Sequence, residues 1–392
     1  MIYLVKTKPD LKSNKSMDYK NEYKDTVYLE DTDGEKTPYL KKDPWVFYRK
    51  IVALYGETES GKSTIIQEIM FLLRKVIPNV IIFAPTNDSN NLYTGKTYKP
   101  GIFSVLSIEI LEEIFQRQKD AVKIYDIANN MDVMKSVFMK VADDRTRAIV
   151  NSVNRDAERH ILLAAQRYTD PGMRKSEEMK IKKMRDDSLR RTYKLCIEAN
   201  RRSLLKNPTI TEAQYIAVYY YEFLPDVLLI FDDCATFFAQ HNNEKIVKDM
   251  FYEGRHGALT SIFSFQGTSN IKPDLRRAAH VSIFTTQASA NAYVGCKENG
   301  ISGDKALKRR WEKCATRIFK PDGDMPTYRK LVYIRGGAEP LQVTLADSYD
   351  DFVMGGLWVR KFLQYIEPKN VASGNNKELI KKIYHMTKTE KH

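Results

Sequence analysis

Short, continuous runs of apolar residues recur along this chain, and each run ends in a polar or glycine-containing turn. A run that is apolar throughout, rather than at every second position, is typical of a strand buried on both faces, as in a parallel sheet. Between the runs, apolar residues recur at helical spacing, as over residues 64–73. This alternation predicts an α/β fold with a central, mostly parallel sheet flanked by helices. The predicted strands cover residues 51–55, 79–86, 227–233, 258–266 and 281–286.

The pattern changes on either side of this core. Residues 7–46 are polar and contain several turn-forming pairs, which predicts an extended arm or, equally, a disordered leader, with one strand at residues 26–30. Residues 315–319 and 328–334 are predicted to form a hairpin that extends the sheet, and residues 378–384 a basic amphipathic helix. We therefore expect three segments: an N-terminal arm at residues 1–44, a main domain at residues 45–340, and a C-terminal helical tail at residues 341–392.

The first predicted strand runs into a glycine turn with the pattern G-x-x-x-x-G-K-S, and a helix follows. Strand, glycine loop and helix in this order are the context of a phosphate-binding P-loop, whereas a plain glycine turn would not need the Lys-Ser pair. Gly56 and Gly61 allow backbone N–H groups to point at a di- or triphosphate. Lys62 is expected to reach the β- and γ-phosphates of ATP, and the Ser63 hydroxyl to bind Mg²⁺. The predicted nucleotide-binding residues are Gly56, Glu57, Thr58, Glu59, Ser60, Gly61, Lys62, Ser63 and Thr64.

Polar side chains also follow two later strands. The run at residues 227–231 leads directly into Asp232 and Asp233. We assign Asp232 to Mg²⁺ and Asp233 to activation of the attacking water, although two acids at this point can also cap a following helix. Gln266 ends the next strand, where it is expected either to position water and sense the γ-phosphate or to hydrogen-bond within a loop. The loop at residues 87–101 leaves the carboxyl end of a core strand, where ligands usually bind in α/β sheets.

Composition predicts a polyanionic partner and argues against a membrane span and a signal peptide. The chain carries a net charge of +13, for which nucleic acid is the first candidate partner. None of its four cysteines has the C-x-x-C spacing of a zinc ribbon or a redox pair, which favours reduced thiols in an intracellular protein. No stretch approaches the roughly 20 apolar residues of a membrane span. The apolar run at the amino terminus is too short for a signal peptide.

A long, mostly helical insertion, placed at about residues 108–220, separates the second strand from the third. Its later part is rich in Lys and Arg, so one face can lie along a DNA backbone. Acidic residues are interspersed among these cations, so the same segment also fits a solvated helix with ion pairs between successive turns. The two interpretations are equally supported by the sequence.

These parts resemble the FtsK/HerA branch of P-loop ATPases, and within it the poxvirus-type genome-packaging ATPases of large DNA viruses. The resemblance covers residues 45–290 apart from the insertion. It rests on the P-loop, on residues 82–86, on residues 229–233, on Gly254-Arg255-His256, whose arginine lies eleven residues before Gln266, and on residues 273–277 before a strand. It implies a RecA-like fold of the additional-strand, catalytic-acid type. FtsK and HerA carry Asp-Glu where this chain has Asp-Asp, so the shorter Asp233 must come closer to the attacking water.

The resemblance also implies a homo-oligomeric ring that moves double-stranded DNA through its channel, with capsid or portal components as partners. An arginine of one subunit would reach the γ-phosphate bound by the next, and Arg255, Arg277 and then Arg276 are the candidates. A viral protein of this kind would act in the host cytoplasm at assembly sites, and the virion is a further location that the resemblance allows.

We therefore predict an ATP-driven double-stranded DNA translocase for viral genome packaging. A helicase, a segregation motor and a poorly hydrolysing assembly scaffold remain as alternatives. A GTPase is disfavoured because the nearest match to N-K-x-D, at residues 376–379, lacks the Asp. A terminase nuclease is disfavoured because the acidic cluster Asp347, Asp350 and Asp351 fits a solvated turn better.

Overall fold

The computed structural model describes residues 28–30, 36–97, 101–301, 303–320, 328–349 and 352–355. These residues form two compact units, one made of the described parts of residues 1–119 and 224–392 and the other of residues 120–223. The helix predicted at residues 378–384 lies outside the described part of the chain.

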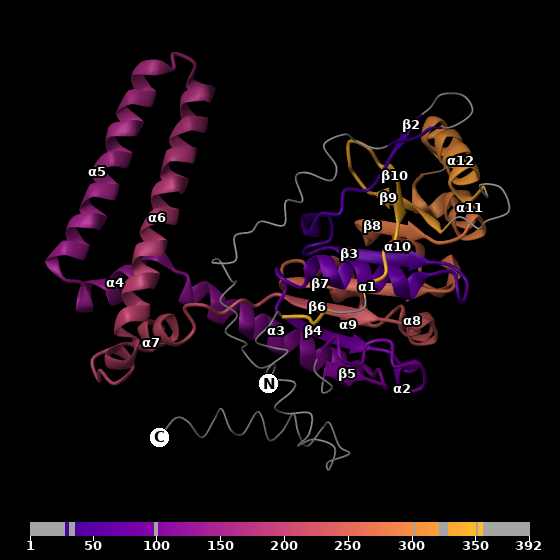
Figure 1. The fold of residues 1–392 in the computed structure, drawn as a ribbon, viewed down its shortest axis with the longest axis horizontal. Coiled ribbons are helices and arrows are strands. Elements are labelled where there is room, and N and C mark those ends of the chain that lie inside the picture. Colours follow the sequence, from indigo (N-terminus) through magenta and orange to yellow (C-terminus); the bar gives the residue numbers. More distant parts are fainter. Residues whose placement is uncertain are drawn as a thin grey trace, which may run out of the picture. The chain divides into compact units, whose positions relative to one another are not determined.

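The first unit contains an eight-stranded sheet with the strand order β10-β9-β8-β3-β7-β6-β4-β5 (Figure 1). Six strands are parallel, and β9 and β10 join them in antiparallel pairing. The fold class predicted from the apolar runs is therefore confirmed. The strands of this sheet are β3 (Ile51–Tyr55), β4 (Asn79–Phe83), β5 (Ile102–Phe103), β6 (Val227–Phe231), β7 (Leu259–Phe265), β8 (Val281–Phe284), β9 (Arg329–Ile334) and β10 (Leu341–Leu345).

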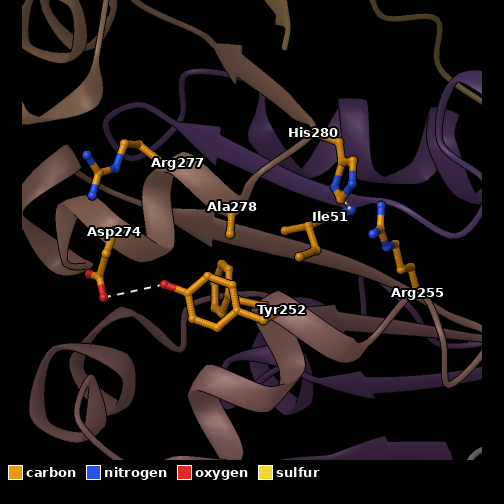
Figure 2. Close-up of a pocket in the computed structure, with 8 residues that line it drawn as sticks. Ile51, Tyr252, Arg255, Asp274, Arg277, Ala278 and His280 are labelled. Carbon is orange, nitrogen blue, oxygen red and sulfur yellow. Dashed lines mark hydrogen bonds between the residues drawn. The ribbon is translucent and has the colours of Figure 1, made fainter. Parts of the chain in front are cut away.

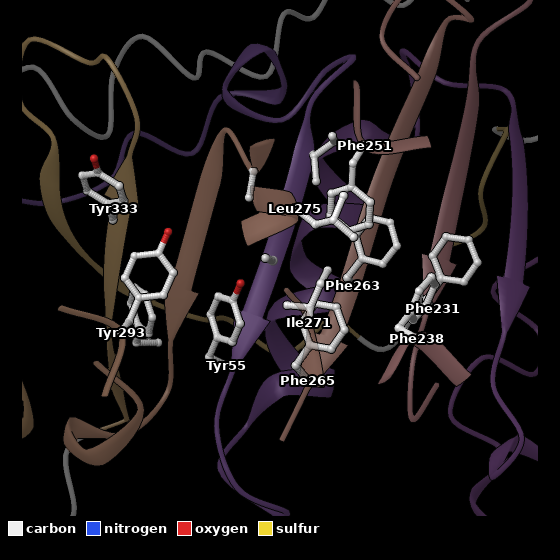
Figure 3. Packing of buried hydrophobic residues seen from close by; sticks show 14 of the residues in the cluster. Tyr55, Phe231, Phe238, Phe251, Phe263, Phe265, Ile271, Leu275, Tyr293 and Tyr333 are labelled. Atoms are coloured by element: carbon white, nitrogen blue, oxygen red, sulfur yellow. The ribbon is translucent and has the colours of Figure 1, made fainter. Parts of the chain in front are cut away.

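Helices cover both faces of this sheet, because successive residues of each strand point to opposite sides. On one face, Val52 and Leu54 pack with helix α1 (Lys62–Leu73). On the other face, Tyr55 belongs to an aromatic cluster in which Phe263 stacks on Phe231 and Phe251 at centroid distances of 4.9 and 4.5 Å (Figure 3). The helices on this second face are α3 (Ile108–Ala128), α8 (Ala235–His241), α9 (Lys245–Glu253), α10 (Pro273–Ala278), α11 (Gln287–Gly295) and α12 (Lys305–Phe319).

The second unit is entirely helical and has its own apolar core, formed around Phe138, Tyr193 and Ile197. Asp143 and Asp170 start its two long helices by accepting hydrogen bonds from backbone N–H groups of the first turn, and proline follows Asp170 at the first helical position. The predicted helical insertion is thus confirmed as helical. Its helices are α4 (Met131–Val141), α5 (Asp144–Arg167), α6 (Pro171–Leu205) and α7 (Glu212–Tyr219), and α5 and α6 lie side by side (Figure 1).

Three local predictions differ from the structure. Residues 315–319 belong to α12, and β9 instead pairs with β10, so the predicted hairpin was wrong in its first strand. The alternating burial of α12 shows the reason: Trp311, Ala315 and Ile318 recur at helical spacing. β10 also occupies the start of the segment predicted as a helical tail. A four-residue helix, α2 (Asn87–Asn90), interrupts the predicted loop at residues 87–101.

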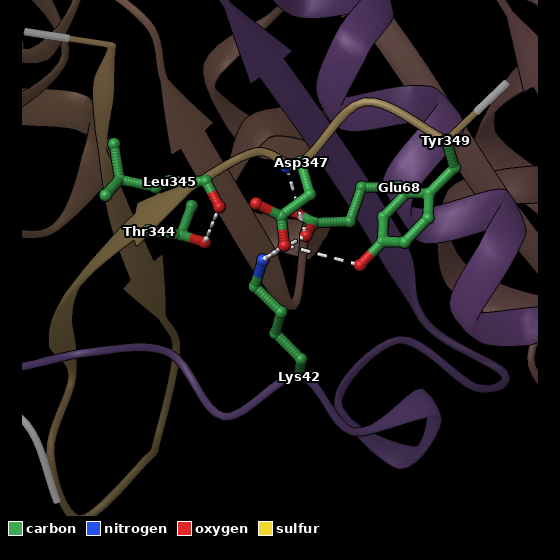
Figure 4. Close-up of polar contacts among 6 residues, drawn as sticks. All are labelled: Lys42, Glu68, Thr344, Leu345, Asp347 and Tyr349. Atoms are coloured by element: carbon green, nitrogen blue, oxygen red, sulfur yellow. Dashed lines mark hydrogen bonds and ion pairs between the residues drawn. The ribbon is translucent and has the colours of Figure 1, made fainter. Parts of the chain in front are cut away.

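The strand predicted at residues 26–30 is present as β1 (Tyr28–Glu30), which pairs with β2 (Lys36–Pro38). Residues that follow β2 pack on the main sheet: Tyr39 forms a bridge with Val343, and Leu40 is buried. Lys42 forms ion pairs with the buried Glu68 of α1, at 2.6 Å, and with Asp347 (Figure 4). Asp347, predicted to lie on a solvated turn, therefore ties the chain after β10 to the P-loop helix.

Candidate active site

The strand order gathers the predicted site at the carboxyl edge of the sheet. Tyr55 at the end of β3 is paired with Phe265 at the end of β7, and β7 in turn pairs with β6. The P-loop after β3, Gln266 after β7 and the two acids after β6 therefore leave one edge. The strand β7 stands between the P-loop strand and the acidic strand, which is the additional-strand arrangement that the sequence resemblance implies.

The P-loop backbone has the curled conformation that the two glycines were expected to allow. Gly61 has φ = 86°, in the left-handed region, and Glu59 has φ = 61°. A Cβ atom on Gly56 would lie 1.7 Å from Oγ1 of Thr285, so no side chain fits there. Glu57, Thr58 and Glu59 are exposed, and α1 begins directly after the loop at Lys62. The loop therefore presents a helix N-terminus with a tight, side-chain-free approach, as a phosphate cradle requires.

Lys62 lies folded across the loop. Its ammonium donates to the backbone oxygens of Gly56 and Glu57, at 2.7 and 2.6 Å, and the side chain is buried. Burial lowers the pKa of Lys62, while the charges of Asp232, Asp233 and Glu57 act in the opposite direction. The lysine is thus held at the loop and within electrostatic reach of both acids.

The two acids after β6 lie in different environments. Asp232 is 5% exposed and accepts a hydrogen bond of 2.7 Å from the hydroxyl of Tyr93. Burial raises the pKa of Asp232, and the hydrogen bond from Tyr93 partly offsets this. Asp233 is exposed, has φ = 56°, and accepts a hydrogen bond of 2.8 Å from Oγ1 of Thr86. One carboxylate is therefore buried and fixed, and the other faces solvent, as a metal ligand and a proton acceptor would require.

Sequence reasoning missed Tyr93, which donates to Asp232, and Asn87, which holds Tyr93 in place. Tyr93 is fully buried, and its backbone N–H is held by the side chain of Asn87 at 3.0 Å. Both residues lie in the polar segment after β4, for which only a general role in ligand binding was predicted. A buried tyrosine in that segment needs a hydrogen-bond partner for its hydroxyl, and this was the available signal.

Gln266 occupies the predicted position, directly after Phe265, whose backbone oxygen accepts from the N–H of Gly56 at 3.1 Å. Its side chain is exposed. Burial therefore does not oblige it to find a protein partner.

The three candidate arginines separate into two groups. Arg276 is buried and donates to the side chain of Asn299 at 2.9 Å and to backbone oxygens of Thr268 and Ile271. The guanidinium donors of Arg276 are thus bonded to acceptors of the same chain, so this arginine has a structural role. Arg255 and Arg277 are exposed.

Arg255 and Arg277 line one pocket of about 360 Å³, together with Tyr252, Asp274 and His280 (Figure 2). Ile51, the first residue of β3, also lines it, so the pocket lies at the amino edge of the sheet. Four strand steps of ~3.3 Å place this edge about 13 Å from the P-loop edge. Neither arginine is positioned to reach the P-loop of its own chain.

The residues present fit a magnesium ion bound largely through phosphate. Ser63 lies in the first turn of α1, and Asp232 offers one carboxylate at the same edge of the sheet. Among the described residues, no group of three or more His, Cys, Asp or Glu side chains forms a protein cage for a metal. Mg²⁺ usually binds through one or two carboxylates and substrate phosphates, so this donor set is sufficient.

Similarity to known proteins extends beyond these residues. No protein-family model matches the chain. The structure is similar to the genome packaging NTPase B204 of Sulfolobus turreted icosahedral virus 2, solved with ATP-gammaS, at 13% identity over 79% of this chain and 99% of that chain, with a TM-score of 0.34. It is also similar to the pCW3 conjugation coupling protein TcpA, at 11% identity over 87% of this chain and 70% of that chain, with a TM-score of 0.39.

Two relatives by sequence come from African swine fever virus isolates. The protein from a Kenyan pig isolate is 29% identical, and the protein from a Malawian tick isolate is 30% identical, in both cases over 315 residues that make up 77% of this chain and 83% of the relative. The chain therefore belongs to the family of the uncharacterized protein B354L of African swine fever virus.

Proposed function

We propose that this chain hydrolyses ATP with Mg²⁺ and uses the energy to move double-stranded DNA, as the ATPase of a viral genome-packaging motor. The observation that carries this proposal is the meeting of the P-loop, a buried acid and an exposed acid at one edge of the sheet, with β7 between the two strands that position them. The viral source of the relatives favours packaging over the other tasks of a DNA translocase.

In this proposal, each residue of the site has one task. Residues 56–64 hold the phosphate chain of ATP, and Lys62 exchanges its two carbonyl partners for phosphate oxygens. Ser63 and Asp232 would hold Mg²⁺, which when bound would neutralise charge that develops on the β- and γ-phosphates. Asp233 accepts a proton from the attacking water, and Gln266 positions that water. The protein contributes mainly positioning and electrostatic stabilisation, as is general for phosphoryl transfer.

The location of Arg255 and Arg277 supports a site shared between subunits. At the amino edge of the sheet they are too far from their own P-loop, but they are exposed and available to a neighbouring copy. Burial, together with the charges of Arg255, Lys50 and Arg335, lowers the pKa of His280 beside them, so this edge is strongly cationic. Such an edge suits the γ-phosphate held by the next subunit of a ring.

The helical unit and the net charge of +13 support DNA as the substrate that is moved. Several cations of α6 form ion pairs on its surface, such as Arg174 with Glu178 at 3.0 Å and Lys180 with Glu177 at 3.1 Å. Both interpretations of this unit, a DNA-binding face and a solvated helix pair, therefore stay as predictions. Among the described residues, no helix combines the length and apolarity that crossing a bilayer requires.

The direct test is steady-state ATP hydrolysis with and without double-stranded DNA. We expect DNA to stimulate hydrolysis, and Lys62→Ala to abolish it while circular dichroism stays unchanged. Lys75→Ala, which removes an exposed lysine just beyond the same helix, is the matched control and should hydrolyse ATP normally. A hydrolysis rate that does not change when DNA is added would favour the assembly scaffold, and strand displacement on forked DNA would favour a helicase.

A mixing experiment tests the shared site. Subunits with Arg255→Ala and subunits with Asp233→Asn should each be inactive alone, and mixed oligomers should regain part of the activity, because some interfaces then contain both intact residues. The same mixture with Arg277→Ala identifies which arginine acts. Mixed oligomers that stay inactive, despite proof of mixing, would rule out an arginine contribution across the interface.

A further inference from the structure

A buried lysine lies beside the P-loop and has no role in the proposal above. Lys330 belongs to β9 and is 4% exposed. A methyl group built on Gly61 would lie 3.1 Å from its Nζ and 3.4 Å from its Cε. The register explains this approach: Leu331 is paired with Phe284, which is itself paired with Tyr55 at the end of the P-loop strand. Lys330 therefore leaves the sheet at the same edge as the P-loop.

Among the described residues, the side chain of Lys330 makes no hydrogen bond or ion pair, although its ammonium is not fully enclosed by protein atoms. The other buried lysines of the sheet region differ in this respect. Lys62 donates to two loop carbonyls, and Lys96 donates to the backbone oxygen of Tyr349 at 2.8 Å. Burial lowers the pKa of Lys330, and no neighbouring charge opposes that effect among the described residues. A buried cation without a counter-charge is costly, so an anion is the natural partner.

We propose that Lys330 is a second phosphate-binding lysine and that it contacts the α- and β-phosphates of the nucleotide held by the P-loop. The strand order decides which phosphates it meets. Asp232 follows β6, two strands from β3 on one side, whereas Lys330 lies on β9, two strands from β3 on the other side. Ser63 and Asp232 would hold the metal on the side of the acids, where it would neutralise charge on the terminal phosphates. The opposite side of the P-loop, where Lys330 lies, therefore meets the part of the phosphate chain nearer to the nucleoside.

This inference rests on the proposed function, and it predicts a distinctive affinity pattern. Lys330→Met removes the charge and keeps an apolar chain of similar length. It should weaken binding of both ADP and ATP by about tenfold, the loss of one charge-assisted hydrogen bond, and by the same factor for the two nucleotides. Because this contact would be shared by the ground state and the transition state, its loss in Lys330→Met should raise KM and leave kcat almost unchanged.

The stability of Lys330→Met separates phosphate binding from a structural role, because loss of a structural lysine would lower the melting temperature. Without nucleotide, Lys330→Met should raise the melting temperature, because it removes a buried charge that lacks a partner. Lys330→Arg should retain part of the affinity, and Lys75→Met, an exposed charge removal, should change neither affinity nor stability. The measurements are calorimetric titration with ADP and ATP, steady-state kinetics, and thermal unfolding of the nucleotide-free protein.

The outcomes separate this inference from the proposed function. If the unmodified chain binds neither ADP nor ATP, both proposals are wrong. If it binds both and Lys330→Met binds them equally well, only the Lys330 assignment is wrong. Weakened binding of ATP alone would indicate that the ammonium contacts the γ-phosphate, and it would refute the position argued from the strand order. A lower melting temperature in Lys330→Met would show that the lysine supports the fold instead.

Discussion

The hydrogen bond from Tyr93 to Asp232 offers a sharp test of how the metal-side carboxylate is held. The Tyr93 hydroxyl donates to Oδ2 of Asp232 at 2.7 Å, and both side chains are buried. Tyr93→Phe keeps the ring and removes only this donor. A buried hydrogen bond to a charged group contributes about 1.5–3 kcal/mol, so the variant should lose that much free energy of unfolding. The loss is measured by urea unfolding of the nucleotide-free protein at pH 7.

Tyr55→Phe is the matched control, because Tyr55, at the end of β3, is equally buried (Figure 3). Its hydroxyl has no hydrogen-bond partner in the described part of the chain. Removing it should leave the free energy of unfolding unchanged or raise it by up to about 1 kcal/mol. Equal losses in the two variants would refute the view that the Tyr93 hydroxyl is a specific donor to Asp232.

The same variant makes a prediction about the pH dependence of hydrolysis. Burial already raises the pKa of Asp232, and the hydrogen bond from Tyr93 lowers it. Asp232 must be ionised to bind Mg²⁺, so activity falls as the pH decreases through its pKa. Loss of the donor raises that pKa further, and the acidic limb of the rate profile of Tyr93→Phe should move to higher pH. An unmoved acidic limb would separate Asp232 from the ionisation that limits hydrolysis.

Three further variants test the site and its support. Lys42→Ala should destabilise the protein by about 3 kcal/mol in urea unfolding, because Glu68 then stays buried without its cation, whereas Lys41→Ala, which removes an exposed lysine, should change stability by less than about 0.5 kcal/mol. Asp232→Asn should abolish hydrolysis and yet raise the melting temperature at pH 7. The raised pKa of Asp232 means that its stabilising contribution is complete only below the unfolded value of 3.8 and is lost as pH rises through the folded pKa. Gly56→Ala would place a methyl group 1.7 Å from a hydroxyl oxygen, so nucleotide binding and thermal stability should both fall.

These three predictions have clear contrary outcomes. Gly295→Ala, at the end of α11 with open space around its Cβ position, is the control for Gly56→Ala and should be neutral or stabilising. Normal nucleotide binding by Gly56→Ala would contradict the close approach at the P-loop. A melting temperature of Asp232→Asn below that of the unmodified chain would show that the ionised carboxylate stabilises the fold. Equal losses of stability in Lys41→Ala and Lys42→Ala would show that the buried ion pair of Lys42 with Glu68 does not stabilise the fold.

Local sequence determined most of what identifies the site. Continuous apolar runs are typical of strands buried on both faces, so β3, β4, β6, β7 and β8 were predictable from the local pattern of residues. The P-loop conformation was predictable because it depends on Gly56 and Gly61 within one turn of chain, and the carboxylates of Asp232 and Asp233 because they follow a strand directly. These features need only contacts between residues close in sequence.

Only the tertiary structure decided which distant side chains meet at that edge. The donor to Asp232 is Tyr93, 139 residues away, and the lysine beside Gly61 is Lys330 on a strand that pairs with β8. Strand order also placed Arg255 and Arg277 at the edge opposite the P-loop, which their sequence positions do not reveal. The physical reason is that the order of strands depends on how whole faces of the sheet are buried. That burial involves many residues far apart in sequence, so no single stretch of the chain determines it.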